Sequence, residues 1–328
     1  MKRIFAFLFL LALTTAGKAT PAPEALQRKS LKFAVISDLH QDIMHDASKR
    51  LTDFLQAAKD QKVDFIINLG DFCQVKKENA AIMKMWNGYD GEKHLALGNH
   101  DMDNCSKEEY IRFAGMPGRY YSFDKGDFHF IVLDPNHVYD GKKYIPYSHG
   151  NFYVDASKRE FIDEEQMEWL KNDLRNTQKR CILFSHQCLE NVVGNRTAVR
   201  AILEDENRRA GFRKVVAAFS GHSHTDYMKE INGIAYIQIN SASNQWVGDA
   251  YQCPERFCKE INRQRPSLKF VVPYRDTLYG IVTVKRSGLH VKGVKSTFIP
   301  PTPQALNIPA DFFPFPLVPR ISDYQVDF

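Results

Sequence analysis

The sequence lacks the features that mark several common protein classes. Its six cysteines contain no Cys-x-x-Cys pair, and six thiols are few for a chain of 328 residues. The missing pair makes a structural zinc site of that type unlikely. A disulfide framework is not expected either, because a chain of this length can stabilise its own core. Cys253 and Cys258, in a proline-containing loop, are the best local pair for a single disulfide. No internal repeat stands out, and the 44% share of hydrophobic residues is typical of a globular protein.

Long apolar runs are also missing, apart from one at the start of the chain. Lys2-Arg3 precedes the apolar run Ile4–Leu13, and small residues follow, with cleavage positions after Ala16 or Ala19. This order is typical of a secretory signal peptide. The run is too short to span a bilayer, which takes about 20 residues, and no cysteine follows it directly, which disfavours a lipoprotein. We therefore expect residues 1–19 to be removed, no stable membrane insertion, and a periplasmic or secreted mature protein.

A strong excess of one charge is absent too. The formal charge of +5 includes Lys2, Arg3 and Lys18, so cleavage after Ala19 leaves +2 on the mature chain. Short basic runs occur, and solvated helix and loop faces account for them. A near-neutral protein has little electrostatic affinity for a phosphate backbone, so no nucleic-acid partner is expected.

The first hundred residues alternate short apolar runs with amphipathic stretches. The spacing of Leu51, Phe54 and Ala58 places apolar side chains on one face of a helix. The whole pattern predicts the order strand, helix, strand, helix, strand over residues 31–37, 48–60, 64–69, 77–86 and 93–97. Strands that are joined through helices are usually parallel neighbours, so an α/β fold is expected.

After residue 100 an irregular stretch precedes a renewed alternation of strands and helices. We expect a hairpin at residues 120–133, a long loop at 135–155, a helix at 163–176, a strand at 180–185, a helix at 196–209 and a strand at 214–220. Asp163 is expected to cap the first of these helices, with Gln166 completing a capping box. Two further hairpins are expected to turn at Asn232-Gly233 and Ser287-Gly288.

The amino-acid composition changes near Thr297, and seven prolines occur among the residues that follow. Proline cannot donate a hydrogen bond to a helix or a sheet, so this part is expected to be an extended tail along the domain surface. The chain then divides into a signal peptide, one α/β domain over residues 20–296, and a proline-rich C-terminal extension over residues 297–328.

Polar side chains of a few types follow five of the apolar runs. These clusters are Asp38-Leu39-His40, Gly70-Asp71, Gly98-Asn99-His100-Asp101, Ser185-His186 and Gly221-His222-Ser223-His224. Taken singly, the Asp-x-His and Gly-Asp motifs are typical of ordinary turns, and the His-x-His pair fits a surface position as well as a metal site. Five in order, each closing a strand-like run, instead predict a ligand site at the carboxyl edge of a sheet.

The chemistry of these clusters indicates a metal site. They contain seven candidate ligands, namely Asp38, His40, Asp71, Asn99, His186, His222 and His224. Carboxylate, amide and imidazole groups together suit Mn, Fe, Zn, Co or Ni better than calcium. In an extended segment, residues two apart point the same way, as expected for Asp38 with His40 and for His222 with His224. A lone carboxylate such as Asp71 can bridge two ions roughly 3.5–4 Å apart.

The ordered set of motifs resembles the calcineurin-like metallophosphoesterase superfamily over about residues 31–290. The resemblance implies a four-layer α/β sandwich with a dinuclear metal centre. One divalent transition-metal ion would then be held by Asp38, His40, Asp71 and His224. The other would be held by Asp71, Asn99, His186 and His222, so that Asp71 bridges the two.

The resemblance also implies catalytic roles for two neighbours of Asn99. His100 would contact the phosphoryl oxygens or protonate the leaving oxygen, and Asp101 would orient His100. One position departs from the family pattern, because many members have a further Asp where this chain has Gln74. The purple acid phosphatase branch has a tyrosine ligand in that motif, so Gln74 argues against a tyrosinate–iron centre.

The expected function is an exported dinuclear-metal phosphoesterase acting on a small phosphate ester. A water or hydroxide held between the ions would attack phosphorus, and neither a serine nor a cysteine nucleophile is indicated. A phosphomonoesterase is the first choice, with a cyclic-nucleotide phosphodiesterase or a nucleotide pyrophosphatase as alternatives. A non-catalytic metal- or phosphate-binding protein is disfavoured, because His100 and all seven ligands are present. No separate organic cofactor site is indicated, and the sequence leaves the oligomeric state open.

Overall fold

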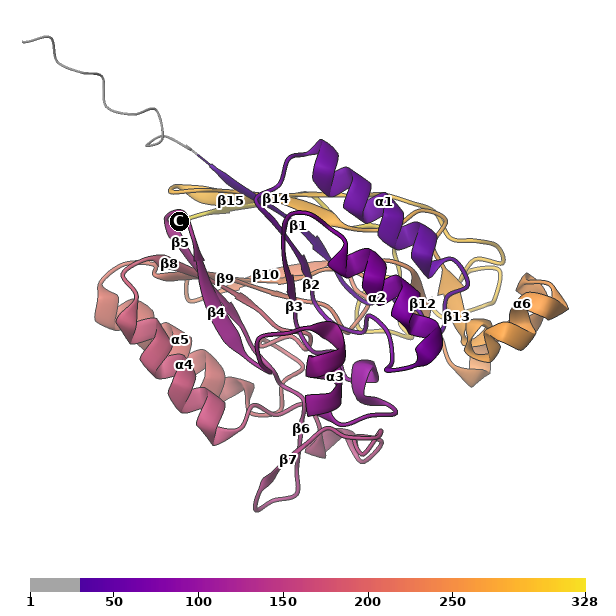
Figure 1. Ribbon diagram of the computed structural model, residues 1–328, viewed down its shortest axis with the longest axis horizontal. Helices are drawn as coiled ribbons and strands as arrows, with labels where there is room; N and C mark the ends of the chain where they lie inside the picture. Colours follow the sequence, from indigo (N-terminus) through magenta and orange to yellow (C-terminus); the bar gives the residue numbers. More distant parts are fainter. Residues whose placement is uncertain (1–29) are drawn as a thin grey trace, which may run out of the picture.

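Two six-stranded mixed sheets lie at the centre of the computed structural model (Figure 1), which describes residues 30–328. The predicted signal peptide lies outside these residues. The first sheet has the order β16 (Tyr324–Asp327), β15 (Gly288–Gly293), β14 (Gly280–Lys285), β1 (Leu31–Ile36), β2 (Phe65–Asn68) and β3 (Glu92–Leu95). Strands β1, β2 and β3 are parallel neighbours, which confirms the prediction for the first hundred residues, and the other pairs are antiparallel.

The second sheet has a parallel centre with an antiparallel strand at each edge. Its order is β10 (Tyr227–Ile231), β11 (Ile234–Gln238), β9 (Val215–Ser220), β8 (Arg180–Phe184), β5 (Phe128–Val132) and β4 (Tyr121–Lys125). The hairpin between β10 and β11 turns at Asn232-Gly233, where both residues have positive φ, as expected for this sequence. The two sheets together supply all five strand ends that carry the polar clusters.

Alternating side chains explain how each strand serves two cores. In β1, Phe33 and Val35 face the second sheet, whereas Ala34 and Ile36 belong to a different buried cluster. This is the period of two expected of a strand buried on both faces. Between the sheets, aromatic rings pack closely, with Phe33 stacked on Phe65 at 5.0 Å between centroids and edge-on to Phe184 at 5.5 Å.

Helices cover the outer faces of both sheets (Figure 1). Helices α1 (Ala47–Asp60) and α2 (Ala80–Asn87) bury Leu51, Phe54 and Trp86 against the first sheet. Helices α4 (Glu164–Asn176) and α5 (Arg196–Ala210) bury Leu170 and Leu203 against the second. The protein is therefore an α/β fold of two mixed sheets flanked by helices. Within the described residues, no helix has the length and apolar character needed to cross a membrane.

Two local predictions differ from the structure. Helix α3 (Lys107–Ala114) was not predicted, although Ser106 and Glu109 form a full capping box and Gly115 ends the helix in the left-handed region. Conversely, Asp163 caps α4, but the side chain of Gln166 does not return to it. That amide instead pairs with the backbone N–H and C=O of Asp134, at 2.8 Å each, because a buried backbone segment offers it both a donor and an acceptor.

Smaller elements fill the regions expected to be irregular. The predicted long loop contains a short hairpin of β6 (His137–Tyr139) and β7 (Tyr144–Pro146). A second pair, β12 (Asn244–Trp246) and β13 (Val271–Pro273), lies near the short helix α6 (Lys259–Gln264) (Figure 1). All six cysteines are free thiols, and Cys253 and Cys258, the best local pair in the sequence, are not joined; Cys253 is buried and Cys258 exposed.

The proline-rich residues after 297 are held by specific contacts. The carboxylate of Asp226 accepts hydrogen bonds from Arg320, from the backbone and hydroxyl of Ser322 and from the hydroxyl of Tyr324. The ring of Phe315 packs on Tyr227 at 4.7 Å. The last strand, β16, pairs with β15 at the edge of the first sheet. The sequence predicts no strand there, because the prolines dominate the local pattern.

Candidate metal centre

Five of the seven candidate ligands lie in the left-handed region of backbone conformation. The φ angles are 53° for Asp38, 51° for His40, 52° for Asp71, 66° for His222 and 51° for His224. Such angles are uncommon outside glycine and concentrate at functional sites. The expected extended geometry of the Asp38–His40 and His222–His224 segments is therefore wrong, although the side chains of each pair still enter one site.

Tight contacts between loops hold these conformations in place. The backbone N–H groups of Asp38 and His40 donate to the carbonyl oxygens of Gly70 and Asp71, each at 3.0 Å. A Cβ atom added to Gly98 would collide with Asp71, and one added to Gly221 would collide with Ser37. The glycine before each of these ligand clusters is therefore required by the close approach of one strand-end loop to another.

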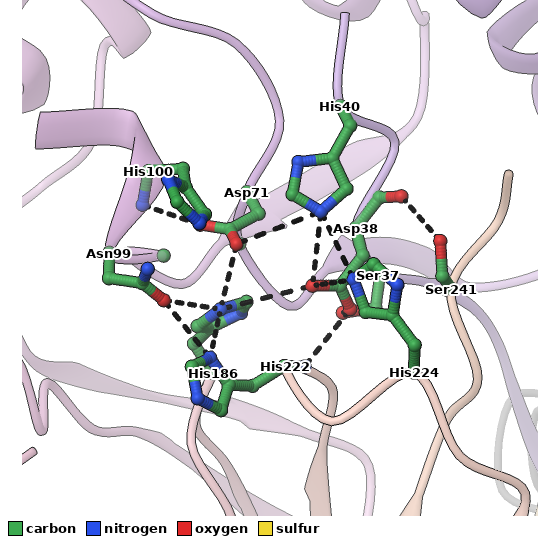
Figure 2. A network of polar contacts seen from close by, with 12 residues as sticks. Ser37, Asp38, His40, Asp71, Asn99, His100, His186, His222, His224 and Ser241 are labelled. Atoms are coloured by element: carbon green, nitrogen blue, oxygen red, sulfur yellow. Dashed lines mark hydrogen bonds and ion pairs between the residues drawn. The ribbon is translucent and has the colours of Figure 1, made fainter. Parts of the chain in front are cut away.

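The first group of ligands combines Asp38, His40 and His224, all buried. The ring nitrogens His40 Nε2 and His224 Nε2 lie 3.1 Å apart, and Asp38 Oδ1 lies 3.3 Å from His224 Nε2 (Figure 2). His224 Nδ1 lies 2.8 Å from the carbonyl oxygen of Asn244, so it carries the proton in a neutral ring and the lone pair of Nε2 faces the group.

The second group combines Asp71, His186 and His222, with the amide oxygen of Asn99 beside them. His186 Nδ1 donates to the carbonyl oxygen of Leu69 at 2.8 Å, which leaves the lone pair of His186 Nε2 facing the group. That nitrogen lies 3.2 Å from Asp71 Oδ2, from Asn99 Oδ1 and from His222 Nδ1 (Figure 2).

Glu160 lies behind the second group and contacts the ring of His222. Its Oε1 atom lies 3.2 Å from His222 Nε2, on the side of the ring that faces away from His186. A carboxylate behind an imidazole fixes the tautomer and raises the basicity of the ring, an arrangement common behind metal-bound histidines. The sequence analysis missed Glu160, because it lies in the irregular segment before α4 and no motif marks it.

These two groups fit metal ions by the chemistry of their donors. Ring nitrogens and carboxylate oxygens converge at 3.1–3.3 Å, where they repel one another unless a metal ion or a proton lies among them. Asp38 Oδ1 is buried and has no hydrogen-bond donor within the described residues, which is costly for a carboxylate without a counter-charge. Imidazole, carboxylate and amide donors are a common set for divalent transition metals.

Asp71 lies between the two groups. Its Oδ2 atom is 3.2 Å from His186 Nε2 in the second group and 3.9 Å from His40 Nε2 in the first. Burial lowers the pKa of His186, but Asp71 and Asp38 outweigh it and raise that pKa to about 10. Burial lowers the pKa of His40 to about 3, so this ring is neutral and one of its nitrogens has a lone pair. The carboxylate charge around His186 favours a cation there, which is a proton on the ring in the metal-free site and would be a metal ion when one binds.

Asp101 does not orient His100 as the resemblance implied. Asp101 Oδ1 accepts the backbone N–H of Phe72 at 2.8 Å, and Oδ2 accepts those of Gly98 and Asp71 at 2.9 and 3.2 Å. Burial, with the nearby Asp71 charge, raises the pKa of Asp101 to about 8. Asp101 therefore ties the loop that carries Asp71 to the loop that carries Asn99.

Asp103 is the carboxylate beside His100. The segment His100–Met102 is a 3₁₀ turn, in which residues three apart lie one above the other. Asp103 Oδ2 consequently lies 3.1 Å from His100 Nδ1. Gln74 Nε2 donates to the same oxygen at 2.8 Å, and the hydroxyl of Tyr153 donates to Oδ1 at 3.1 Å. Gln74, the departure from the family pattern, therefore holds the carboxylate that contacts His100.

A cavity of about 780 Å³ opens onto both groups. Part of its lining, here called the metal wall, consists of His40, Asp71, His100, Asp101, His222 and His224. A second part, here called the C-terminal wall, consists of Gln245, Trp246, Gln264, Arg265, Ser267 and Phe313. The sequence analysis identified the residues of the metal wall and none of the C-terminal wall.

Comparison with known proteins agrees with this geometry. The sequence profile described as calcineurin-like phosphoesterase matches residues 31–226, more than half of the chain. The chain therefore belongs to the calcineurin-like phosphoesterase family and is a metal-dependent phosphoesterase with two candidate metal sites. The profile match includes all seven candidate ligands and ends before the C-terminal wall begins.

Two relatives are informative. The manganese-dependent ADP-ribose/CDP-alcohol diphosphatase of Arabidopsis thaliana is 23% identical in an alignment 219 residues long, which covers 54% of this chain and 70% of that protein. The crystal structure of a dimetal phosphatase from Danio rerio superposes with a TM-score of 0.57 at 15% identity, covering 82% of this chain and 98% of that one. The second comparison supports the fold alone.

Proposed function

We propose that this protein is a dimetal diphosphatase that cleaves the diphosphate linkage of a nucleotide-type substrate. The observation that carries the proposal is the cavity of about 780 Å³. It extends from the metal wall to aromatic and cationic side chains of the C-terminal wall, further than a small phosphate monoester requires. The diphosphatase name of the Arabidopsis relative supports this choice. It favours the pyrophosphatase alternative over the phosphomonoesterase that the sequence placed first.

The residues of the candidate metal centre have distinct roles in this proposal. Asp38, His40 and His224 hold one ion, and Asn99, His186 and His222 hold the other, with Asp71 shared. When bound, the two ions supply Lewis acidity at the phosphorus and lower the pKa of a water molecule. His100 lines the cavity beside these groups and contacts the phosphoryl oxygens or gives a proton to the leaving oxygen. Asp103 holds Nδ1 of His100, so that Nε2 is the nitrogen available to substrate.

A hydrolysis screen of the purified protein tests the reaction. We expect ADP-ribose to be cleaved to AMP and ribose 5-phosphate, because water attack on one phosphorus of the diphosphate releases two monophosphates. p-Nitrophenyl phosphate, bis-p-nitrophenyl phosphate and cyclic AMP should react with lower kcat/KM. A clear preference for p-nitrophenyl phosphate would instead establish a monoesterase, and a preference for cyclic AMP a phosphodiesterase.

Manganese is the proposed metal, and the same assay tests it. The Arabidopsis relative is named as manganese-dependent, and the nitrogen and oxygen donors of both groups accept manganese. Chelated protein should regain diphosphatase activity with Mn²⁺ more fully than with Fe²⁺, Zn²⁺, Co²⁺ or Ni²⁺. If any of the other four ions restored as much activity or more, that ion would take the place of manganese as the proposed metal.

We also propose export from the cytoplasm, which rests on the basic pair and apolar run at the start of the sequence. The mature protein should begin between Thr15 and Pro21 and be found outside the cytoplasm without membrane insertion. N-terminal sequencing of protein from cell fractions is the test. An intact Met1 on membrane-bound protein would show that the apolar run is an anchor.

A further inference from the structure

We propose that the C-terminal wall is the recognition subsite for the part of the substrate beyond the attacked phosphorus. Arg265 binds the second phosphoryl group of a diphosphate, and the rings of Trp246 and Phe313 contact an aromatic base. This inference rests on the proposed diphosphatase function and deepens it, because it assigns substrate recognition to residues outside the metal centre.

Arg265 is available to bind an anion. Among residues 30–328, two Lys or Arg side chains line the cavity, Lys76 and Arg265. Lys76 is neutralised by Asp42 at 3.0 Å, whereas Arg265 has no carboxylate within 4.0 Å in the described part of the chain. Its Nε donates to the carbonyl oxygen of Met44 at 3.2 Å, which leaves the two terminal nitrogens of the guanidinium for a ligand. A planar guanidinium is well suited to bind two phosphoryl oxygens.

The anchor of Arg265 also places it near the metal wall. Met44 is buried, and its backbone N–H donates to the carbonyl oxygen of His40 at 2.8 Å. Arg265 therefore reaches across from the end of α6 to the single turn of chain that begins at His40. A substrate with one phosphoryl group at the metals would bring the next one toward this guanidinium.

The C-terminal wall has two aromatic side chains, of which Trp246 is exposed and Phe313 is half-buried. Trp246 is 45% exposed although its ring packs on Phe270 at 5.6 Å. Phe313 lies in the proline-rich segment, between a contact of Phe312 with Tyr251 at 5.0 Å and one of Phe315 with Tyr227 at 4.7 Å. Aromatic faces that line a cavity suit a planar base, which stacks on them without needing a specific hydrogen bond.

The position of this wall in the sequence is a further argument. All of its residues follow the end of the family profile match at residue 226. The chemistry shared by the family therefore lies in one part of the chain, and the C-terminal wall is added by another. Substrate choice is the property expected to depend on such an added segment, because binding residues often lie on loops that a rigid scaffold positions.

Binding of ADP and of inorganic phosphate to the manganese-loaded protein tests the role of Arg265. Wild type should bind ADP more tightly than phosphate. Arg265→Ala should weaken the binding of ADP by roughly 10- to 100-fold, as expected for loss of a hydrogen bond to a charged group. It should change the affinity for phosphate by less than about twofold. Arg263→Ala is the matched control, because Arg263 is an arginine two residues away in α6, pairs with Glu260 and does not line the cavity.

The aromatic contacts are tested in the same assay. Trp246→Ala and Phe313→Ala should each weaken the binding of ADP by roughly 5- to 100-fold. Trp246→Phe should lose much less affinity than Trp246→Ala, because it keeps a ring in place. Phe212→Ala is the control, since Phe212 is an exposed phenylalanine that does not line the cavity. An equal loss in the Phe212 and Phe313 variants would overturn the aromatic subsite.

The outcomes separate this inference from the proposed function. A wild type that binds ADP as described but does not cleave ADP-ribose would refute the diphosphatase and support the subsite. A wild type that cleaves ADP-ribose but binds ADP no more tightly than phosphate would overturn the subsite alone. If Arg265→Ala weakened the binding of ADP and of phosphate to the same extent, the subsite would also be overturned, since the variant would then have disturbed the metal wall.

Discussion

The metal wall and the C-terminal wall line the same cavity but are built in opposite ways. In the metal wall, His40, Asp71 and His224 are at most 8% exposed and lie in left-handed conformations that neighbouring loops hold in place. In the C-terminal wall, Trp246 is 45% exposed and Phe313 is half-buried. The contrast indicates that the groups needed for chemistry are preorganised at the cost of backbone strain, whereas the groups proposed for recognition are packed more loosely.

The largest expected effect is at the carboxylate shared by the two ligand groups. Asp71→Asn should lose metal from both sites and lower kcat by on the order of 10³-fold or more, because the two-ion arrangement supplies several kcal/mol of charge stabilisation. Metal analysis and single-substrate kinetics measure both effects. His224→Gln should lose less metal, since His224 belongs to one group; equal losses in the two variants would show that Asp71 is not shared.

The next effect is at His100. His100→Gln should keep both ions and lower kcat by roughly 10²- to 10⁴-fold, the usual contribution of a general acid. The loss should shrink on nitrophenyl esters, whose leaving group needs no proton, if His100 is the acid. A constant loss would mean that His100 stabilises charge on the phosphoryl oxygens. Full activity on both kinds of ester would remove His100 from the mechanism.

A smaller effect is expected at Asp103, which acts through His100. Asp103→Asn should lower kcat by roughly 10- to 100-fold, the usual range for a residue that orients a working histidine, with little change in KM. The double variant with His100→Gln should be no slower than His100→Gln alone, because the two residues act as one unit. Additive losses in this cycle would show that Asp103 has a separate structural role.

The smallest effect concerns stability at the C-terminal wall. Trp246→Ala should change the free energy of unfolding by about 0.5 kcal/mol or less, as is usual for exposed positions. Phe33→Ala, between the two sheets and fully buried, should cost about 3–5 kcal/mol. Urea denaturation of both variants measures the difference. A loss of more than about 2 kcal/mol in Trp246→Ala would make that ring a packing residue.

The metal wall could be predicted from sequence because its signal is local. A ligand type directly after an apolar run identifies a strand end, and a preceding glycine marks the close approach of loops, as at Gly98 and Gly221. The alternation of strands and helices likewise predicted the parallel core of the first sheet. The left-handed backbone of the ligands could not be predicted, because it follows from contacts between loops that are distant in sequence.

The remaining features depend on contacts that no local pattern records. Asp101 and Asp103 are two residues apart, and only the 3₁₀ turn decides which of them meets His100. Gln74 and Tyr153 reach Asp103 from two other segments. Phe313 lies among prolines whose composition indicates an extended tail without indicating what the tail contacts. The C-terminal wall was therefore outside the reach of sequence reasoning.

The central claim is that two metal ions act together in one site, and counting them is its most direct test. The purified protein would be stripped with a chelator and titrated with Mn²⁺, with binding by calorimetry and ADP-ribose hydrolysis followed in parallel. The account predicts two Mn²⁺ ions per chain, with most of the activity appearing as the second site fills. Full activity with a single ion per chain, or with none, would contradict it.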